Sequence, residues 1–234
     1  MKNIAIIPAR SGSKGLKDKN IKELNGKPLL AYSVDAAIAS GLFEEVMVST
    51  DSELYANVAK ENGASVPFLR SEEQSGDNAG SWGVVEEVLK RYEALGKRFD
   101  TVCLLQPTSP LRRTEDIVAA YELLNDKNAD AVTSVCEVDH SPLWTMKLDE
   151  SCSLGEFRKN LVSVPRQKLG QYFRLNGAIY IKRICYGEKI SLLDEKEYAV
   201  KMDRRNSVDI DTLEDFELAE WYLNKTRRKN NESI

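Results

Sequence analysis

The chain has 234 residues, of which 42% are hydrophobic and 30% charged, and its formal net charge is −4. This length and apolar content predict one large globular domain, and the acidic balance excludes a general nucleic-acid binder, so that any anion site must be local. No apolar run is long enough for a membrane span, and residues 1–12 lack the features of a signal peptide, so we expect no membrane partner.

The cysteines indicate a cellular compartment and argue against a zinc site. None of the four forms a CxxC pair, and His140 is the only histidine, which excludes a zinc site. Cys103 and Cys136 lie in apolar runs, as buried reduced thiols do. The pattern fits a reducing compartment, and we therefore expect a cytoplasmic protein.

From the N-terminus to residue 138, short apolar runs alternate with amphipathic stretches, which indicates parallel strands joined by crossover helices. Pro28 can start the first helix and Gly41 can end it. Asp51 or Ser52 can cap the second helix, and Thr114 begins a later one. Strands are predicted at residues 3–8, 44–50, 64–70, 100–106 and 129–138.

The pattern changes beyond this point. Residues 141–173 have no clean period, so we expect an inserted lobe at about 139–175. Strand character returns in "NGAIYIKR" and again in "SVDID", which runs into a final helix. Near the start of that helix, Thr212 and Asp215 have almost the spacing of a capping box, and residues 225–234 are expected to fray.

The predicted architecture is a single α/β domain of residues 1–234. It is a three-layer, mostly parallel sheet with helices on both faces, plus the inserted lobe. In such sheets, ligands bind beyond the carboxyl ends of the strands. That rule selects the loops after "IIP", "VST", "CLLQ" and "SVDI" as candidate binding segments.

The first of these loops is strongly basic. Residues 10–22 hold five basic side chains against one acid, Asp18, and Gly12 and Gly15 let backbone amides approach an anion. The loop matches neither GxxxxGK[ST] nor GxGxxG. Because lysine supplies a point charge and arginine a planar fork, both suited to a polyphosphate, we interpret it as a phosphate-binding loop.

A pair of acids stands near the other end of the chain. Asp209 and Asp211 are two residues apart in "SVDID", so on an extended strand both carboxylates face one side. Such a pair suits Mg²⁺, which proteins usually hold with one or two carboxylates plus substrate phosphates. The basic loop and the pair together predict a site for a metal–nucleoside triphosphate, where a leaving pyrophosphate is neutralised.

Two further segments carry groups suited to a polar substrate. In "LLQPTSPLRR", two prolines fix a loop that presents Gln106, Thr108 and Ser109, uncharged groups that suit a hydroxylated molecule. In "PRQKLGQYFRLNGAIYI", Arg166 and Arg174 flank aromatic residues, which favours a carboxylate-bearing partner or a subunit contact.

Five motifs, taken in order, resemble those of the acylneuraminate cytidylyltransferases, or CMP-sialic acid synthetases, including relatives that use legionaminic, pseudaminic or deaminated neuraminic acid. They are "IIPARSGSKGLKDKNI", "VSTDS", "LLQPTSPLR", "FRLNGAIYI" and "SVDIDTLEDF", within about residues 4–220. The resemblance implies a nucleotide-diphospho-sugar transferase-like fold and a homodimer formed through the inserted lobe. It also implies Mg²⁺-dependent transfer of CMP from CTP to a nonulosonic acid, by attack of the anomeric 2-hydroxyl on the α-phosphate.

The resemblance also implies roles for single residues. CTP would be held by Ala9, Arg10, Ser13, Lys19, Asn20 and Arg70, the last of them near the cytosine. Catalysis would fall to Arg10, Lys19, Asn20 and Asp209, and Mg²⁺ to Asp209 and Asp211. The sugar acid would contact Gln106, Arg166, Arg174 and Tyr180, together with the loop residues Thr108 and Ser109.

One position departs from the family's pattern. Trp144 stands where the sialic acid enzymes can carry a lysine that meets the sugar's carboxylate, so the particular nonulosonic acid stays open. One alternative is another nucleotidyltransferase, with a 3-deoxy-octulosonate, polyol-phosphate or sugar-phosphate acceptor. The other is a non-catalytic nucleotide-binding regulator, which the acid pair argues against because a pure binder has less need of a metal.

Overall fold

The structure, a computed structural model, describes residues 1–12, 15–76, 80–160, 170–190 and 194–232. Its centre is a sheet of six strands: β1 (Asn3–Pro8), β4 (Glu45–Ser49), β5 (Thr101–Leu104), β6 (Ala131–Glu137), β7 (Phe173–Arg183) and β8 (Glu197–Met202). They lie in the order β4-β1-β5-β7-β6-β8. All neighbours pair in parallel except β7, which runs antiparallel to both β5 and β6.

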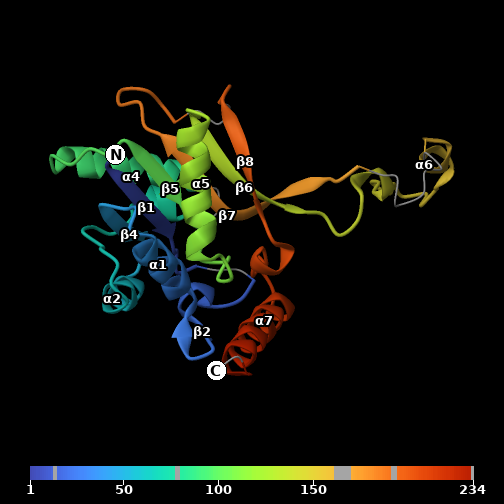
Figure 1. Cartoon of the computed structure of the whole chain (residues 1–234), viewed down its shortest axis with the longest axis horizontal. Coiled ribbons are helices and arrows are strands. Elements are labelled where there is room, and N and C mark those ends of the chain that lie inside the picture. Colours follow the sequence, from blue (N-terminus) through green and yellow to red (C-terminus); the bar gives the residue numbers. More distant parts are fainter. Residues whose placement is uncertain (13–14, 77–79, 161–169, 191–193, 233–234) are drawn as a thin grey trace.

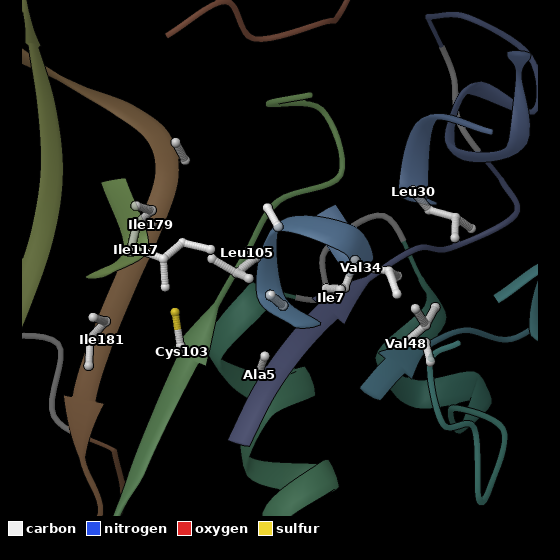
Figure 2. Packing of buried hydrophobic residues seen from close by; sticks show 14 of the residues in the cluster. Ala5, Ile7, Leu30, Val34, Val48, Cys103, Leu105, Ile117, Ile179 and Ile181 are labelled. Atoms are coloured by element: carbon white, nitrogen blue, oxygen red, sulfur yellow. The ribbon is translucent and has the colours of Figure 1, made fainter. Parts of the chain in front are cut away.

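Helices cover both faces of this sheet (Figure 1). The strand β1 is apolar on both sides, and successive side chains of a strand point to opposite faces. Ala5 and Ile7 pack in the cluster shown in Figure 2, with side chains of α1 (Leu29–Ser40) and α5 (Thr114–Asp126). Ile4 and Ile6 pack with side chains of α4 (Ser81–Ala94). The predicted three-layer, mostly parallel α/β architecture is therefore confirmed. The main helices are α1 (Leu29–Ser40), α2 (Glu53–Glu61), α4 (Ser81–Ala94), α5 (Thr114–Asp126) and α7 (Leu213–Glu232).

Short elements complete the domain. The basic loop ends in a 3-10 turn, and a two-stranded hairpin follows it, turning through Asn25 and Gly26 at φ 52° and 75°, the backbone that an Asn-Gly hairpin turn requires. Thr212 and Asp215 form the expected reciprocal bonds at the start of α7. The remaining elements are η1 (Lys19–Ile21), β2 (Glu23–Leu24), β3 (Lys27–Pro28), α3 (Glu72–Ser75), η2 (Pro142–Trp144), α6 (Gly155–Asn160) and η4 (Arg204–Asn206).

Two predicted strands are wrong. Residues 64–70 make only a single bridge, between Ser65 and Met47. Residues 207–211 form no strand, because Ile210 N–H donates to the Thr108 carbonyl at 2.8 Å and not to a sheet neighbour. The strand at the edge of the sheet beside β6 is β8, which was not predicted from the sequence.

The segment that was predicted to form an inserted lobe joins the end of β6 to the start of β7. Its described part, residues 139–160 and 170–172, which we call the arm, holds only the short helices η2 and α6. Figure 1 shows α6 standing well away from the sheet. The arm exposes the large apolar side chains of Leu143, Trp144, Met146, Leu148 and Leu154. Across the described ranges, no helix has both the length and the apolar character needed to cross a bilayer.

Candidate functional site

A cleft of about 610 Å³ opens at the carboxyl ends of β1 and β5. This is where the rule for parallel sheets places a ligand. Eight of the predicted site residues line it: Arg10, Lys19, Asn20, Arg70, Gln106, Thr108, Asp209 and Asp211. Ser81 and Val84 of α4 also line it and were not predicted, although a polar residue at the start of a helix is a recognisable signal.

The basic loop is held by its own side chains. Ala9 is buried, and its N–H continues the strand by donating to the Ser49 carbonyl at 2.9 Å. The buried Asn20 amide donates to the Arg10 carbonyl at 3.0 Å, which draws the two ends of the loop together. The Arg10 guanidinium reaches across to the Gly76 carbonyl at 3.2 Å. Asn20 therefore has a structural task in the loop besides any contact with a ligand.

A second support comes from the segment after β4. The Asp51 carboxylate accepts hydrogen bonds from the Ser11 N–H at 2.8 Å and the Ser11 hydroxyl at 2.9 Å. The Tyr55 hydroxyl of α2 donates to the Asp18 carboxylate at 3.1 Å. Ser52, and not Asp51, caps α2. The Asp51 side chain therefore does not cap the helix but holds the basic loop through Ser11. The sequence did not predict this role, because it depends on a contact between segments that are distant in the chain.

The loop and the acidic segment are in direct contact. The Lys19 ammonium donates to the Ile210 carbonyl at 2.6 Å and to the Asp211 carboxylate at 2.9 Å. A Cβ on Gly15 would lie 2.7 Å from the Asp211 carbonyl oxygen, so only glycine permits this approach. These contacts bring together two segments that are almost two hundred residues apart in the sequence.

The two acids of this site have different surroundings. Asp209 Oδ1 is buried and has no hydrogen-bond partner among the described residues, whereas the Asp211 side chain is 75% exposed. Burial raises the pKa of Asp209, a hydrogen bond from Thr108 opposes the rise, and the charge of Asp211 adds to it. The expectation that both carboxylates share one side of a strand is corrected here, because the segment is irregular and its acids differ in depth.

These acids fit a hard cation. A buried carboxylate oxygen without a partner is costly, and a divalent ion would satisfy it. No group of three or more His, Cys, Asp or Glu side chains suited to a metal occurs among the described residues. A magnesium ion held by two carboxylates would therefore take its other ligands from phosphates and water, as that ion commonly does.

Arg70 is held rigidly at the edge of the cleft. Its Nε donates to the Ser49 hydroxyl at 3.1 Å, and its NH2 group donates to the Ser49 carbonyl at 2.5 Å. Burial lowers the pKa of Arg70 to about 10, so the guanidinium stays charged at neutral pH. Ser49, at the end of β4, thus holds the positively charged Arg70 guanidinium at the cleft.

The Gln106 side chain lies beside the acids. Gly177 of β7 has φ +77°, and a Cβ there would lie 2.6 Å from Gln106 Oε1 and 3.7 Å from Asp209 Oδ2. Further along β7, Tyr180 is half-buried, with its ring edge-to-face with Trp82 at 6.4 Å between centroids. Burial, followed by the charge of Asp209, raises the pKa of Tyr180.

The remaining predicted sugar residues are not assembled around the cleft. Ser109 is fully buried, and its hydroxyl has no partner among the described residues. Arg174 is exposed and reaches the Ser207 carbonyl at 3.5 Å, outside the cleft lining. Ser13 and Arg166 lie outside the described residues. Four of the six predicted CTP residues and both predicted metal ligands thus line one cleft, whereas of the six predicted sugar residues only Gln106 and Thr108 line it.

The sequence of the chain matches a family model and several known proteins. A family model described as Cytidylyltransferase matches residues 4–227. An N-acylneuraminate cytidylyltransferase from Streptococcus agalactiae serotype V is 41% identical over 220 residues, which are 92% of this chain and 52% of that protein. A CMP-N,N'-diacetyllegionaminic acid synthase from Legionella pneumophila is 38% identical, over 94% of this chain and 95% of its own length.

The chain spans about half the length of the streptococcal relative, 52% of it. Among solved structures, a CMP:2-keto-3-deoxy-manno-octonic acid synthetase complexed with CTP superposes with a TM-score of 0.72 at 16% identity, covering 97% of this chain and 100% of the other. At that identity the likeness establishes the fold, in agreement with the sheet described above.

Proposed function

The chain belongs to the cytidylyltransferase family, and from this premise we propose that it transfers CMP from CTP to the anomeric 2-hydroxyl of a nonulosonic acid. The observation that carries the proposal is the contact of Lys19 and Gly15 with Ile210 and Asp211. That contact unites a cationic loop with a carboxylate pair, the combination that a metal–triphosphate requires.

In the proposed reaction, the 2-hydroxyl gives up its proton to water as its oxygen forms a bond to the α-phosphorus. The bond from that phosphorus to the oxygen that it shares with the β-phosphate breaks, and pyrophosphate leaves. Arg10 and Lys19 lie in the cleft where their charges would neutralise the departing pyrophosphate. Asn20 would keep Arg10 in place through its bond to the Arg10 carbonyl. Ala9, Ser13 and Arg70 are proposed as the further CTP contacts, with the rigid Arg70 cation near the base.

Asp209 and Asp211 would hold Mg²⁺, and Asp209 would also lie near the attacking hydroxyl. When bound, the ion neutralises phosphate charge and lowers the pKa of a coordinated hydroxyl. The chain's own contribution is to hold Asp209 at the floor of the cleft beside Gln106 and Thr108, which would orient the sugar.

The acceptor proposed is a nonulosonic acid, which is supported by the names of both curated relatives. Ser109, Arg166, Arg174 and Tyr180 are proposed to complete its site. The arm's exposed apolar side chains would be covered by a second copy of the chain, giving a homodimer, which light scattering tests. A cytoplasmic location remains our proposal, supported by the free, buried thiols of Cys103 and Cys136.

Pyrophosphate release tests the proposal directly. The purified chain is mixed with Mg²⁺, each of CTP, UTP, ATP and GTP, and a panel of acceptors. The panel holds neuraminic, legionaminic and pseudaminic acids, a 3-deoxy-octulosonate, a polyol phosphate and a sugar phosphate. Release with CTP and a nonulosonic acid is expected. Pyrophosphate release only with another class of acceptor would show that the substrate is not a nonulosonic acid. Tight CTP binding without turnover on any acceptor would favour a non-catalytic nucleotide-binding regulator.

Gln106→Ala is expected to raise the KM for the sugar by about tenfold or more, because a site that loses one hydrogen bond to a substrate hydroxyl loses roughly 1–2 kcal/mol. CTP binding should stay within about twofold, since the Gln106 side chain is placed beside Gly177 of β7 and is proposed to contact only the sugar. Steady-state kinetics and CTP calorimetry separate the two effects. If CTP affinity falls by a larger factor than the KM for the sugar rises, Gln106 does not act in the sugar site.

Asp51→Ala is expected to weaken CTP binding by about tenfold, because the loop loses two hydrogen bonds to a charged acceptor. The matched control is Ser52→Ala, next in the chain, which removes the α2 cap and should cost about 1 kcal/mol of stability without changing CTP affinity. Calorimetric titration and thermal melts check both. Equal CTP affinities in the two variants would show that Asp51 does not act through the loop.

A further inference from the structure

The strand β7 contains a large irregularity opposite β6. Thr133 pairs with Tyr180, and Val135 pairs with Leu175, so β7 advances five positions while β6 advances two. The extra residues lie around Asn176 and Gly177, next to the cleft. Such bulges leave backbone groups without ladder partners, and something else must satisfy them.

The Asn176 side chain does this from a buried position, with 1% of its surface exposed. Its Oδ1 accepts hydrogen bonds from the Ser134 hydroxyl at 2.6 Å and the Ala178 N–H at 3.3 Å. Its Nδ2 donates to the Ser207 hydroxyl at 2.9 Å and lies 3.3 Å from the sulfur of Met202. All four hydrogen-bonding positions of the amide are therefore used inside the protein.

The bond to Ser207 joins the bulge to the acidic segment. Ser207 is 1% exposed and stands two residues before Asp209. Its hydroxyl also donates to the Asp203 carbonyl at 2.8 Å, so it cannot donate to Asn176 and must accept from the amide. On the other side of Asp209, the Ile210 N–H is fixed to the Thr108 carbonyl at 2.8 Å. Asp209 is thus held between two anchors.

The same bulge sets the floor beneath the cleft side chains. Gly177, the residue after Asn176, approaches Gln106 Oε1 and Asp209 Oδ2 so closely that a Cβ would lie 2.6 Å and 3.7 Å from them. Asn176 itself does not line the cleft. Any role it has in the reaction must therefore act through the groups that it holds.

We propose that Asn176 is a positioning residue, whose buried amide locks the β7 bulge to Ser207 and thereby places the Asp209 carboxylate for the metal–triphosphate. The inference rests on the proposed function, because it concerns the same site. Partners behind a metal ligand commonly control metal affinity by about 10- to 100-fold when removed.

The test measures Mn²⁺, a paramagnetic stand-in for Mg²⁺, by electron paramagnetic resonance in the presence of CTP, on the full chain. Asn176→Ala and the milder Ser207→Ala are each expected to raise the Mn²⁺ dissociation constant by about tenfold or more. The double variant should lose little more Mn²⁺ affinity than either single variant, because both substitutions break the same hydrogen bond between Asn176 and Ser207.

Ser134→Ala is the matched control. It removes two buried hydrogen bonds of the same network, to Asn176 and from the Ile179 N–H, but leaves the bond to Ser207. Its melting temperature should fall as in Asn176→Ala, while its Mn²⁺ affinity stays within about twofold of the parent. Unchanged Mn²⁺ affinity in folded Asn176→Ala and Ser207→Ala overturns the inference, as does an equal loss in Ser134→Ala. A parent chain that binds Mn²⁺ with CTP but releases no pyrophosphate contradicts the proposed function alone.

Discussion

Asp209→Asn is expected to lower the rate of CMP transfer by about a thousandfold or more, while the protein stays folded. The substitution keeps the size of the side chain but removes the charge of a half-buried carboxylate whose buried Oδ1 has no partner among the described residues. A metal ligand supplies several kcal/mol of charge stabilisation, and each 1.4 kcal/mol is about tenfold in rate. Pyrophosphate release at saturating CTP and sugar measures the loss.

Stability separates this effect from unfolding. Because burial raises the pKa of Asp209, the ionised form is disfavoured in the folded protein, and a neutral asparagine should melt at an equal or higher temperature. Asp203→Asn makes the same change at an exposed position a few residues earlier and should keep the parent rate. An Asp209→Asn variant that transfers CMP at the parent rate would show that the Asp209 carboxylate has no role in the reaction.

Gly15→Ala is expected to lower activity by about a hundredfold or more, through geometry and not through charge. The added Cβ would lie 2.7 Å from the backbone carbonyl of Asp211, and a backbone atom cannot turn aside as a side chain can. The loop must then move away from the acidic segment, which would separate the bound triphosphate from its metal by a distance that positioning-dependent catalysis does not tolerate.

Gly12→Ala provides the comparison within the same loop. A Cβ on Gly12 meets no described atom within 4 Å, so this variant should stay within several-fold of the parent. Both variants should show the parent circular dichroism spectrum, because the change is confined to one loop. If Gly15→Ala and Gly12→Ala lose activity equally, the close contact with Asp211 is not what the glycine provides.

Much of the fold was accessible from the sequence because its signals are local. The apolar run of β1 and the helix starting at Thr114 were read from pattern alone, and both are present. The strand β8 was missed because only Val200 and Met202 of its six residues are buried. The acidic pair was placed on a strand because its composition is strand-like, whereas tertiary bonds to Thr108 and Lys19 determine its actual path.

The candidate site divides in the same way. The sequence indicates Arg10, Lys19 and Asp209 through their charge and their position after predicted strands, and all three line the cleft in the structure. Asp51 and Asn176 carry no such signal, because their partners Ser11 and Ser207 are distant in sequence and become neighbours only in the fold. The roles of the proposed sugar residues Arg166 and Arg174 remain predictions.

In the proposed function, the anomeric hydroxyl of the sugar attacks the α-phosphate of CTP at the cleft where the basic loop meets Asp211. The most direct measurement uses a nonulosonic acid labelled with ¹⁸O at the 2-hydroxyl, with products analysed by mass spectrometry and ³¹P NMR. We expect the label to bridge sugar and phosphorus in the CMP-sugar and to be absent from the pyrophosphate. Unlabelled CMP-sugar, or no coupling of CTP to any nonulosonic acid, would contradict it.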